Sequence, residues 1–144
     1  DEDGYLSVYE ITGNKLWKSS DKYGGSETCF KHESLTQMRS IGDQYRWTFI
    51  EQRIIALPDG TLLVPRNEGI FSVGNSRSYN KHTLHALKWN GALLNEIWHT
   101  RQSPSYLTDF AYDHSSREVL LLEVVQKAEL FSKGKTAITI HRIE

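Results

Sequence analysis

Short runs of alternating hydrophobic and polar residues recur along the whole chain, and turn-forming residues separate them. Alternation with a period of two predicts β-strands that turn every second side chain toward a core. The expected strands are Tyr5–Ile11, Lys15–Ser19, Trp47–Leu57, Thr61–Pro65, Thr83–Trp89, Leu93–Thr100, Leu107–Tyr112, Glu118–Gln126 and Thr136–Ile143. Turns such as Pro58-Asp59-Gly60 and Asn90-Gly91 favour hairpins between them. The pattern predicts an all-β protein.

Two segments do not follow this alternation. Val124–Phe131 contains Ala and Glu but lies between a β-branched strand and a Gly turn, so we predict a loop there with at most one helical turn. Gly69–Lys81 is polar and rich in Gly, Ser and Asn. We expect a long loop there, a place for function or disorder.

One hairpin sequence occurs more than once. Leu6–Tyr9, a glycine turn and Lys15–Ser20 correspond to Leu84–Trp89, a glycine turn and Glu96–Thr100. A third copy of the first strand is Ala137–His141, where isoleucines alternate as the apolar residues do in the first copy. We therefore expect Tyr5–Ile11 and Thr136–Ile143 to occupy matching positions in their sheets.

A further two-stranded unit precedes each later copy of the hairpin. Arg53–Leu57 turns into Thr61–Val64, and Asp109–Tyr112 turns into Val119–Leu122. Each unit and the hairpin after it form an antiparallel four-stranded module that is apolar on both faces, so the modules must stack as the blades of a β-propeller do.

This count predicts a single all-β repeat domain over residues 1–144, with a partial blade at about 1–30, a full blade at about 45–101 and a partial blade at about 106–144. A closed ring needs at least about four blades. Two to three blades therefore imply a longer parent protein or exchange with another copy. The turn-like start, Asp1–Gly4, is interpreted as the sign of a fragment or processed product.

Charge and composition exclude several classes of partner. The chain has 17 Lys and Arg against 18 Asp and Glu, so no net field attracts nucleic acid. No apolar run reaches the roughly 18 residues of a membrane span. The single cysteine, Cys29, rules out an internal disulfide and is expected to be a small buried hydrophobe.

The order and spacing of the segments resemble those of the FG-GAP or VCBS repeat proteins, bacterial relatives of the integrin α-chain propeller. The resemblance rests on Asp3–Tyr9, Leu16–Ser20, Gly24–Ser26, Arg53–Asn67, Ala86–Gly91, Trp98–Arg101, Asp109–Ala111 and Gly134–Ile138. It implies a periplasmic or secreted protein that serves as an interaction platform, with Ca²⁺ bound in an Asp-x-Asp-x-Asp-Gly turn of each blade.

The corresponding turns here lack the ligands for calcium. The first offers only Asp59, and the second, Asp113–Glu118, places Arg117 where further oxygen ligands belong. Calcium needs about six to eight oxygens, and a nearby cation opposes its binding. Asp1–Gly4 has more carboxylates but lies at a different hairpin, so we expect a solvated turn. We predict no metal and no cofactor.

The histidines do not form a predicted metal site. His82 and His85 are the tightest pair, but residues three apart on a strand point to opposite faces. His99 and His141 are expected to be half-buried partners of backbone or Tyr groups.

Catalytic motifs are also missing from the sequence. No Gly-x-Ser-x-Gly elbow is present, and a strand follows Gly134-Lys135-Thr136 where a phosphate-binding loop needs a helix. A carboxylate pair such as Glu51 and Asp109 would have to meet across blades. We assign no catalytic, cofactor-binding or metal residue, and the ligand-binding residues stay unassigned.

Trp17 and Trp98 occupy equivalent places in two repeats, which favours packing between blades. An aromatic platform for sugar remains open for an exposed tryptophan, either Trp47 or Trp89. The sequence thus predicts a non-catalytic module that binds a protein or glycan partner, with self-association through incomplete blades. The alternatives are the scaffold portion of a secreted hydrolase or carbohydrate-binding protein whose site lies elsewhere, and a purely structural propeller wall.

Overall fold

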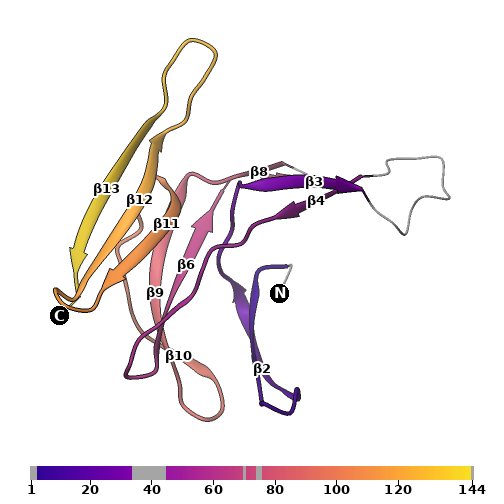
Figure 1. Ribbon diagram of the computed structural model, residues 1–144, viewed down its shortest axis with the longest axis vertical. Helices are drawn as coiled ribbons and strands as arrows, with labels where there is room; N and C mark the ends of the chain where they lie inside the picture. The colour runs from indigo at the N-terminus through magenta and orange to yellow at the C-terminus, as the bar shows by residue number, and fades with distance from the viewer. Residues whose placement is uncertain (1–2, 34–44, 70, 74–75, 144) are drawn as a thin grey trace.

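The computed structural model describes residues 3–33, 45–69, 71–73 and 76–143, and within these ranges the protein consists of β-strands, turns and loops without a helix (Figure 1). The strands are β1 (Tyr5–Tyr9), β2 (Lys15–Lys22), β3 (Cys29–Glu33), β4 (Tyr45–Phe49), β5 (Ile55–Ala56), β6 (Thr61–Glu68), β7 (Phe71–Val73), β8 (Ser76–Ser78), β9 (Lys81–Trp89), β10 (Leu94–His99), β11 (Tyr106–Asp113), β12 (Glu118–Gln126) and β13 (Lys135–Arg142). None of the described segments forms a helix that is long and apolar enough to cross a membrane. The prediction of an all-β protein is confirmed.

Three antiparallel sheets form the body of the molecule. The N-terminal sheet pairs β1 with β2, the central sheet has the order β10-β9-β6-β5, and the C-terminal sheet has the order β11-β12-β13. They lie side by side in Figure 1, with β11–β13 on the left, the central sheet in the middle and β2 on the right. Two small hairpins, β3–β4 and β7–β8, complete the described structure. The described residues show no closed ring of blades.

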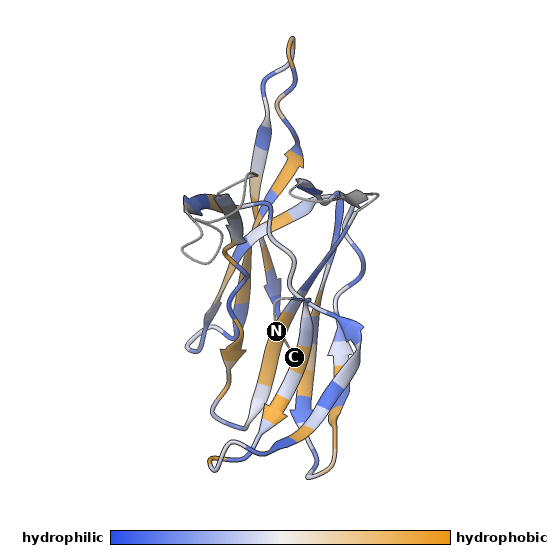
Figure 2. Ribbon diagram, turned by 90° about the vertical axis from the view of Figure 1, so that its right-hand side faces the viewer, coloured by the Kyte–Doolittle hydropathy of each residue, from blue (hydrophilic) through white to orange (hydrophobic). Residues whose placement is uncertain are grey.

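The inner strands of the central sheet, β6 and β9, are buried on both faces. Hydrophobic and hydrophilic positions alternate along the long strands (Figure 2), yet all residues from His82 to Leu87 are buried. Leu84 and Ala86 pack with Leu63 against the C-terminal sheet. His85, on the opposite face, contacts the ring of Tyr23, which follows β2. A strand covered on both sides needs neighbours on both sides, which the flanking sheets provide.

The repeated hairpin has one irregularity at equivalent places, although the N-terminal copy also has a further register shift between Tyr5 and Ser7. In the N-terminal sheet Val8 lies opposite Trp17, and in the central sheet Ala86 lies opposite Trp98. In each hairpin the register shifts by one residue immediately before the Trp, which leaves Leu16 and Ile97 as the extra residues of two β-bulges. Both bulged residues are exposed. The copies inferred from sequence therefore share a bulge that the sequence analysis did not anticipate.

The third copy of the hairpin strand forms β13, which pairs only with β12 among the described strands. Ile138 lies opposite Leu122 and Ile140 opposite Leu120, so these four apolar residues share the outer face of the C-terminal sheet. Ile138 and Ile140 are 67% and 59% exposed. The equivalent face of the central sheet is covered by the next sheet, whereas no described segment covers this one.

The expectation of one strand over Trp47–Leu57 is wrong. The segment divides into β4 and β5, which belong to different sheets, and β4 pairs with β3, a strand that the sequence analysis did not predict. The break occurs where two polar side chains bind outside the strand: Glu51 contacts Arg77, and Gln52 donates a hydrogen bond to the Leu107 carbonyl. These tertiary contacts override a continuous hydrophobic pattern.

The expectation of an irregular loop over Gly69–Lys81 is also wrong. Phe71–Val73 and Ser76–Ser78 pair as the β7–β8 hairpin, and the Asn80 N–H donates to the Glu68 carbonyl at 3.0 Å. Backbone pairing rather than an apolar side-chain pattern forms this hairpin, so its composition resembles that of a loop. Gly74 and Asn75 lie outside the described residues.

Candidate metal centre

Strand β9 presents two histidines three residues apart, and they face opposite sides of the central sheet. His82 lies against Ser105 and Glu123 on the side of the C-terminal sheet. His85 lies on the other side, with Glu96 and His99. The two histidines therefore do not contact each other, and each lies next to a different glutamate.

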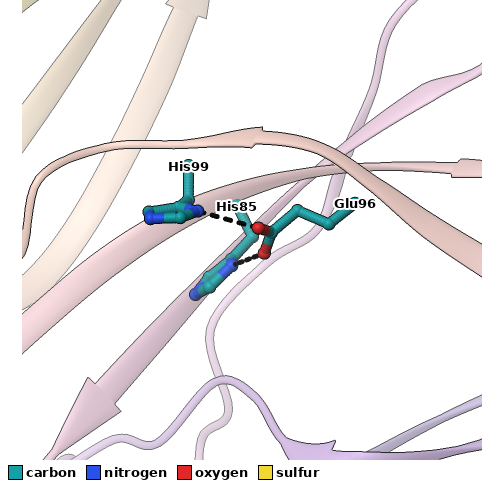
Figure 3. Close-up of side chains that lie close together, drawn as sticks. All are labelled: His85, Glu96 and His99. Carbon is teal, nitrogen blue, oxygen red and sulfur yellow. Dashed lines mark hydrogen bonds and ion pairs between the residues drawn. The ribbon is translucent and has the colours of Figure 1, made fainter.

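His85, Glu96 and His99 form a compact cluster on β9 and β10, which we call the open cluster (Figure 3). Nδ1 of His85 is 2.5 Å from one carboxylate oxygen of Glu96, and Nδ1 of His99 is 2.8 Å from the other. The one ligand atom that each residue offers lies within 4.8 Å of the other two. Two imidazole nitrogens and a carboxylate oxygen are ligands that zinc accepts.

The bulge in β10 explains why Glu96 and His99 converge. Residues three apart in a regular strand point to opposite faces, so these two would normally diverge. Because Ile97 is an extra residue in the ladder, Glu96 lies opposite Leu87 while His99 lies opposite His85, two positions along the same face. Bulges commonly re-aim a side chain next to a functional site.

The open cluster is accessible to solvent along its β10 side. The side chains of His85, Glu96 and His99 are 10%, 40% and 57% exposed. The hydrogen bond from His85 is the main cause that lowers the pKa of Glu96; partial burial opposes it, and the bond from His99 adds to it. Nε2 of His85 is buried without a hydrogen-bond partner in the described part of the chain. The cluster is thus polar, open on one side and incompletely paired.

Tyr23 borders the open cluster from the direction of the N-terminal sheet. Its ring meets that of His85 edge-on, with centroids 5.4 Å apart. Partial burial, together with the nearby carboxylates of Asp21 and Glu96, raises the pKa of Tyr23, and Arg66 partly offsets this. Tyr23 therefore stays a neutral phenol that covers one edge of His85.

The second cluster, which we call the buried cluster, joins the central and C-terminal sheets. Glu123 accepts hydroxyl hydrogen bonds from Ser105 at 2.6 Å, Ser103 at 2.9 Å and Thr139 at 2.6 Å. Nε2 of His82 lies 3.5 Å from the same carboxylate, and the two side chains are 1% and 6% exposed. Burial opposes ionisation, but the hydroxyl bonds and His82 outweigh it and lower the pKa of Glu123.

The buried cluster contains Ser, His and Glu, the residue types of a catalytic triad. However, the Ser105 hydroxyl donates to Glu123 at 2.6 Å. It also lies 3.3 Å from Nδ1 of His82, but that nitrogen is closer to the Ser105 carbonyl, at 3.0 Å, and both Ser105 and His82 are buried. A nucleophile needs a base that takes its proton and access for a substrate. The arrangement suits a structural polar seam in which each donor and acceptor is used.

The carboxylates considered for hydrolysis have separate partners. Glu51 contacts Arg77 at 2.5 Å and accepts from the Gly25 N–H at 3.2 Å, while Asp109 contacts Arg53 at 2.8 Å. Each carboxylate therefore forms an ion pair with its own arginine.

The turns that correspond to calcium loops do not fit that ion. Asp59 accepts hydrogen bonds from the backbone and hydroxyl of Thr61, and Asp113 accepts them from Ser115 and Ser116. Each turn uses its carboxylate to cap its own backbone, as Asx turns do, and leaves far fewer oxygens than calcium requires.

The remaining sequence candidates lie in different environments. The expectation that His99 and His141 are half-buried is wrong, because both are exposed on edge strands. Cys29 is half-buried. Lys135 and Thr136 begin β13, so a strand indeed follows Gly134. Among the tryptophans, Trp47 is 41% exposed, whereas Trp17, Trp89 and Trp98 are half-buried.

Sequence reasoning missed Glu96 and His99 as partners of His85. The signal lay in the repeat itself: the first hairpin has Ser7, Lys15 and Lys18 where the second has His85, Glu96 and His99. At these three positions, which share one face, only the second hairpin has side chains that could bind a metal together.

The chain matches no protein-family model, no curated protein and no solved structure.

Proposed function

We propose that the chain is a non-catalytic segment of a β-propeller repeat protein of the FG-GAP or VCBS kind and that it serves as a binding platform in the periplasm or outside the cell. The observation that carries this proposal is the shared hairpin, in which Val8 with Trp17 and Ala86 with Trp98 pair next to the same bulge. An irregularity repeated at equivalent places favours copies of one unit, and such units stack.

The bare outer face of the C-terminal sheet supports continuation of the stack. The matching face of the central sheet, with Leu84 and Ala86, is covered by the next sheet. Ile138 and Ile140 occupy the same face of the C-terminal sheet and are exposed. A further sheet of the same repeat would present an apolar face that can pack against the outer face of the C-terminal sheet.

Self-association of the 144-residue chain tests the role of this face. We expect a concentration-dependent mass in light scattering, and a double substitution of Ile138 and Ile140 to Ser should reduce it. Ile11→Ser removes a fully exposed isoleucine elsewhere and should have no effect. A wild-type chain that stays monomeric at every concentration, or an equal effect of all variants, would argue against a packing face.

A non-catalytic role is supported by what surrounds the titratable groups. The hydroxyl of Ser105 is buried, and the carboxylates of Glu51 and Asp109 are each held by an arginine. A panel of glycoside and ester substrates should give no turnover. Turnover that disappears in Glu51→Gln or Asp109→Asn would instead support the alternative of a hydrolase scaffold.

The β3–β4 hairpin favours a glycan as the partner. Tyr45 and Trp47 are two residues apart on β4, so they share a face, and both are exposed. Nζ of Lys31 lies 4.0 Å from the Tyr45 ring centroid and 5.8 Å from that of Trp47. Neighbouring aromatic rings with a polar rim stack well against sugar rings, whose C–H faces are apolar.

A glycan array can distinguish the two kinds of partner. We expect binding that is lost in Trp47→Ala and kept in Trp17→Phe, since Trp17 is half-buried in the N-terminal sheet. Binding retained in Trp47→Ala would place the glycan elsewhere, and the absence of any glycan signal would leave a protein as the partner of the platform.

A further inference from the structure

We propose that His85, Glu96 and His99 form a zinc site with one open coordination position. The three residues come from adjacent strands, β9 and β10, which are hydrogen-bonded along their length. The ligands therefore rest on a paired sheet rather than on a loop, which fixes their backbone spacing before any ion binds. This site goes beyond the binding role proposed for the repeat module.

The spacing of the ligand atoms is close to what zinc requires. With zinc–ligand bonds of about 2.0 to 2.1 Å, two ligands of a tetrahedral site lie about 3.3 Å apart. The two nitrogen–oxygen distances here, each to a different oxygen of Glu96, are 2.5 and 2.8 Å, and the three ligand atoms all lie within 4.8 Å of one another, so each separation must change by at most about 1.5 Å. Glu96 and His99 are exposed, and rotation of their side chains can provide this movement.

The chemistry of the donors selects the metal. Two imidazole nitrogens and one carboxylate suit zinc and neighbouring transition metals, whereas calcium and magnesium need oxygen ligands. Glu96 accepts from the two histidines, and no hydroxyl or backbone N–H of the described residues competes for its oxygens. Glu123, in contrast, is occupied by three hydroxyl donors and cannot be approached.

The open position follows from the exposure of the cluster. His85 is buried beneath Tyr23, while the β10 side of the cluster faces solvent. Three protein ligands with solvent on the fourth side leave room for a water molecule or for a donor group from a ligand. The site therefore has the form of an exchangeable centre rather than a closed structural one.

The first repeat provides an internal comparison. At its equivalent positions Ser7, Lys15 and Lys18 replace the three ligands, and two ammonium groups would repel a cation. Of the two described hairpins, only the second therefore has these ligands, and the shared hairpin geometry is not by itself a metal site.

Equilibrium dialysis against Zn²⁺, followed by metal analysis, tests the site. We expect one zinc per wild-type chain, and at least tenfold weaker binding in both Glu96→Gln and His99→Gln. His114→Gln is the matched control, because His114 is exposed and contacts only the ring of Tyr112 in the described structure. Circular dichroism and the unfolding midpoint check that each variant is folded.

Cobalt substitution supplies a second readout that does not depend on stoichiometry. Co²⁺ bound by two nitrogens, one carboxylate and water should give intense visible absorption typical of four or five ligands, and Glu96→Gln should abolish it. The proposal is overturned if the wild type retains no zinc, if His114→Gln weakens binding as much as His99→Gln, or if Glu96→Gln binds Zn²⁺ and Co²⁺ undiminished.

Discussion

His82 and His85 lie three residues apart on β9, and each is close to a glutamate, but the two clusters differ in what surrounds the carboxylate. Around Glu123, three hydroxyl groups donate hydrogen bonds and both sheets exclude water. Around Glu96, two histidines are the only described donors, and one side is open. The comparison shows that residue types alone do not define a site. A carboxylate whose hydrogen-bonding capacity is filled and which solvent cannot reach has a structural role, whereas one with free capacity that solvent can reach is able to bind a ligand.

The largest expected difference is in stability. Glu123→Ala leaves the three hydroxyl donors and His82 without their acceptor in a buried place, which should lower the free energy of unfolding by about 3 to 5 kcal/mol. Glu96→Ala removes a carboxylate that is 40% exposed and should cost under about 1 kcal/mol. Urea unfolding of the two variants measures both values. Equal losses of stability in the two variants would show that both clusters contribute to the fold in the same way.

A single donor to the buried cluster should have a smaller effect. Thr139→Val keeps the shape of the side chain but removes the 2.6 Å bond to Glu123, and should cost about 1.5 to 3 kcal/mol. Thr136→Val, on the exposed part of the same strand, is the control and should stay within about 0.5 kcal/mol. A similar loss in both would indicate a general effect of valine on β13.

Lowering the pH should reduce the contribution of the buried cluster to the free energy of unfolding. The pKa of Glu123 is lower in the folded protein than the ordinary value of 4.5, so the unfolded chain takes up the proton more readily. Its contribution to stability is therefore present above pH 4.5 and is lost as the pH falls through the folded pKa. The free energy of unfolding, plotted against pH across this range, should change less steeply in Glu123→Gln than in the wild type. Equal slopes in the two proteins would contradict the assignment.

Deletion of Ile97 should have the smallest effect on the open cluster. Without the bulged residue, Glu96 and His99 become two positions apart in a regular strand and still share a face. Zinc affinity should therefore stay within a few fold of the wild type, as dialysis would measure. Deletion of Leu16, the bulged residue of β2, controls for the general cost of removing a bulge. If zinc binding is lost on deletion of Ile97 but kept on deletion of Leu16, the bulge must determine the spacing of the ligands as well as the face on which they lie.

Much of the architecture follows from local sequence. Period-two alternation and Gly turns predict the long strands, and the similarity of Leu6–Tyr9 to Leu84–Trp89 predicts hairpins that pair alike. The division of Trp47–Leu57 and the pairing of β3 with β4 could not be predicted, because the break depends on Arg77 and on the Leu107 carbonyl, both distant in sequence.

The open cluster escaped prediction for a geometric reason. The rule that residues three apart diverge correctly separates His82 from His85, but it also separates Glu96 from His99. The extra residue in β10 brings Glu96 and His99 to the same face, and nothing in the local sequence pattern around Ile97 indicates a bulge. The buried cluster was missed because its members come from β9, β12, β13 and the segment before β11.

Urea unfolding with and without Zn²⁺ tests most directly whether the open cluster, and not the buried one, binds the metal. A ligand at about one hundred times its Kd raises the free energy of unfolding by about 2.7 kcal/mol. We predict that increase in the wild type and in Thr139→Val, whose open cluster is intact, and none in Glu96→Gln. Equal stabilisation of Glu96→Gln, or none in the wild type, would contradict the account.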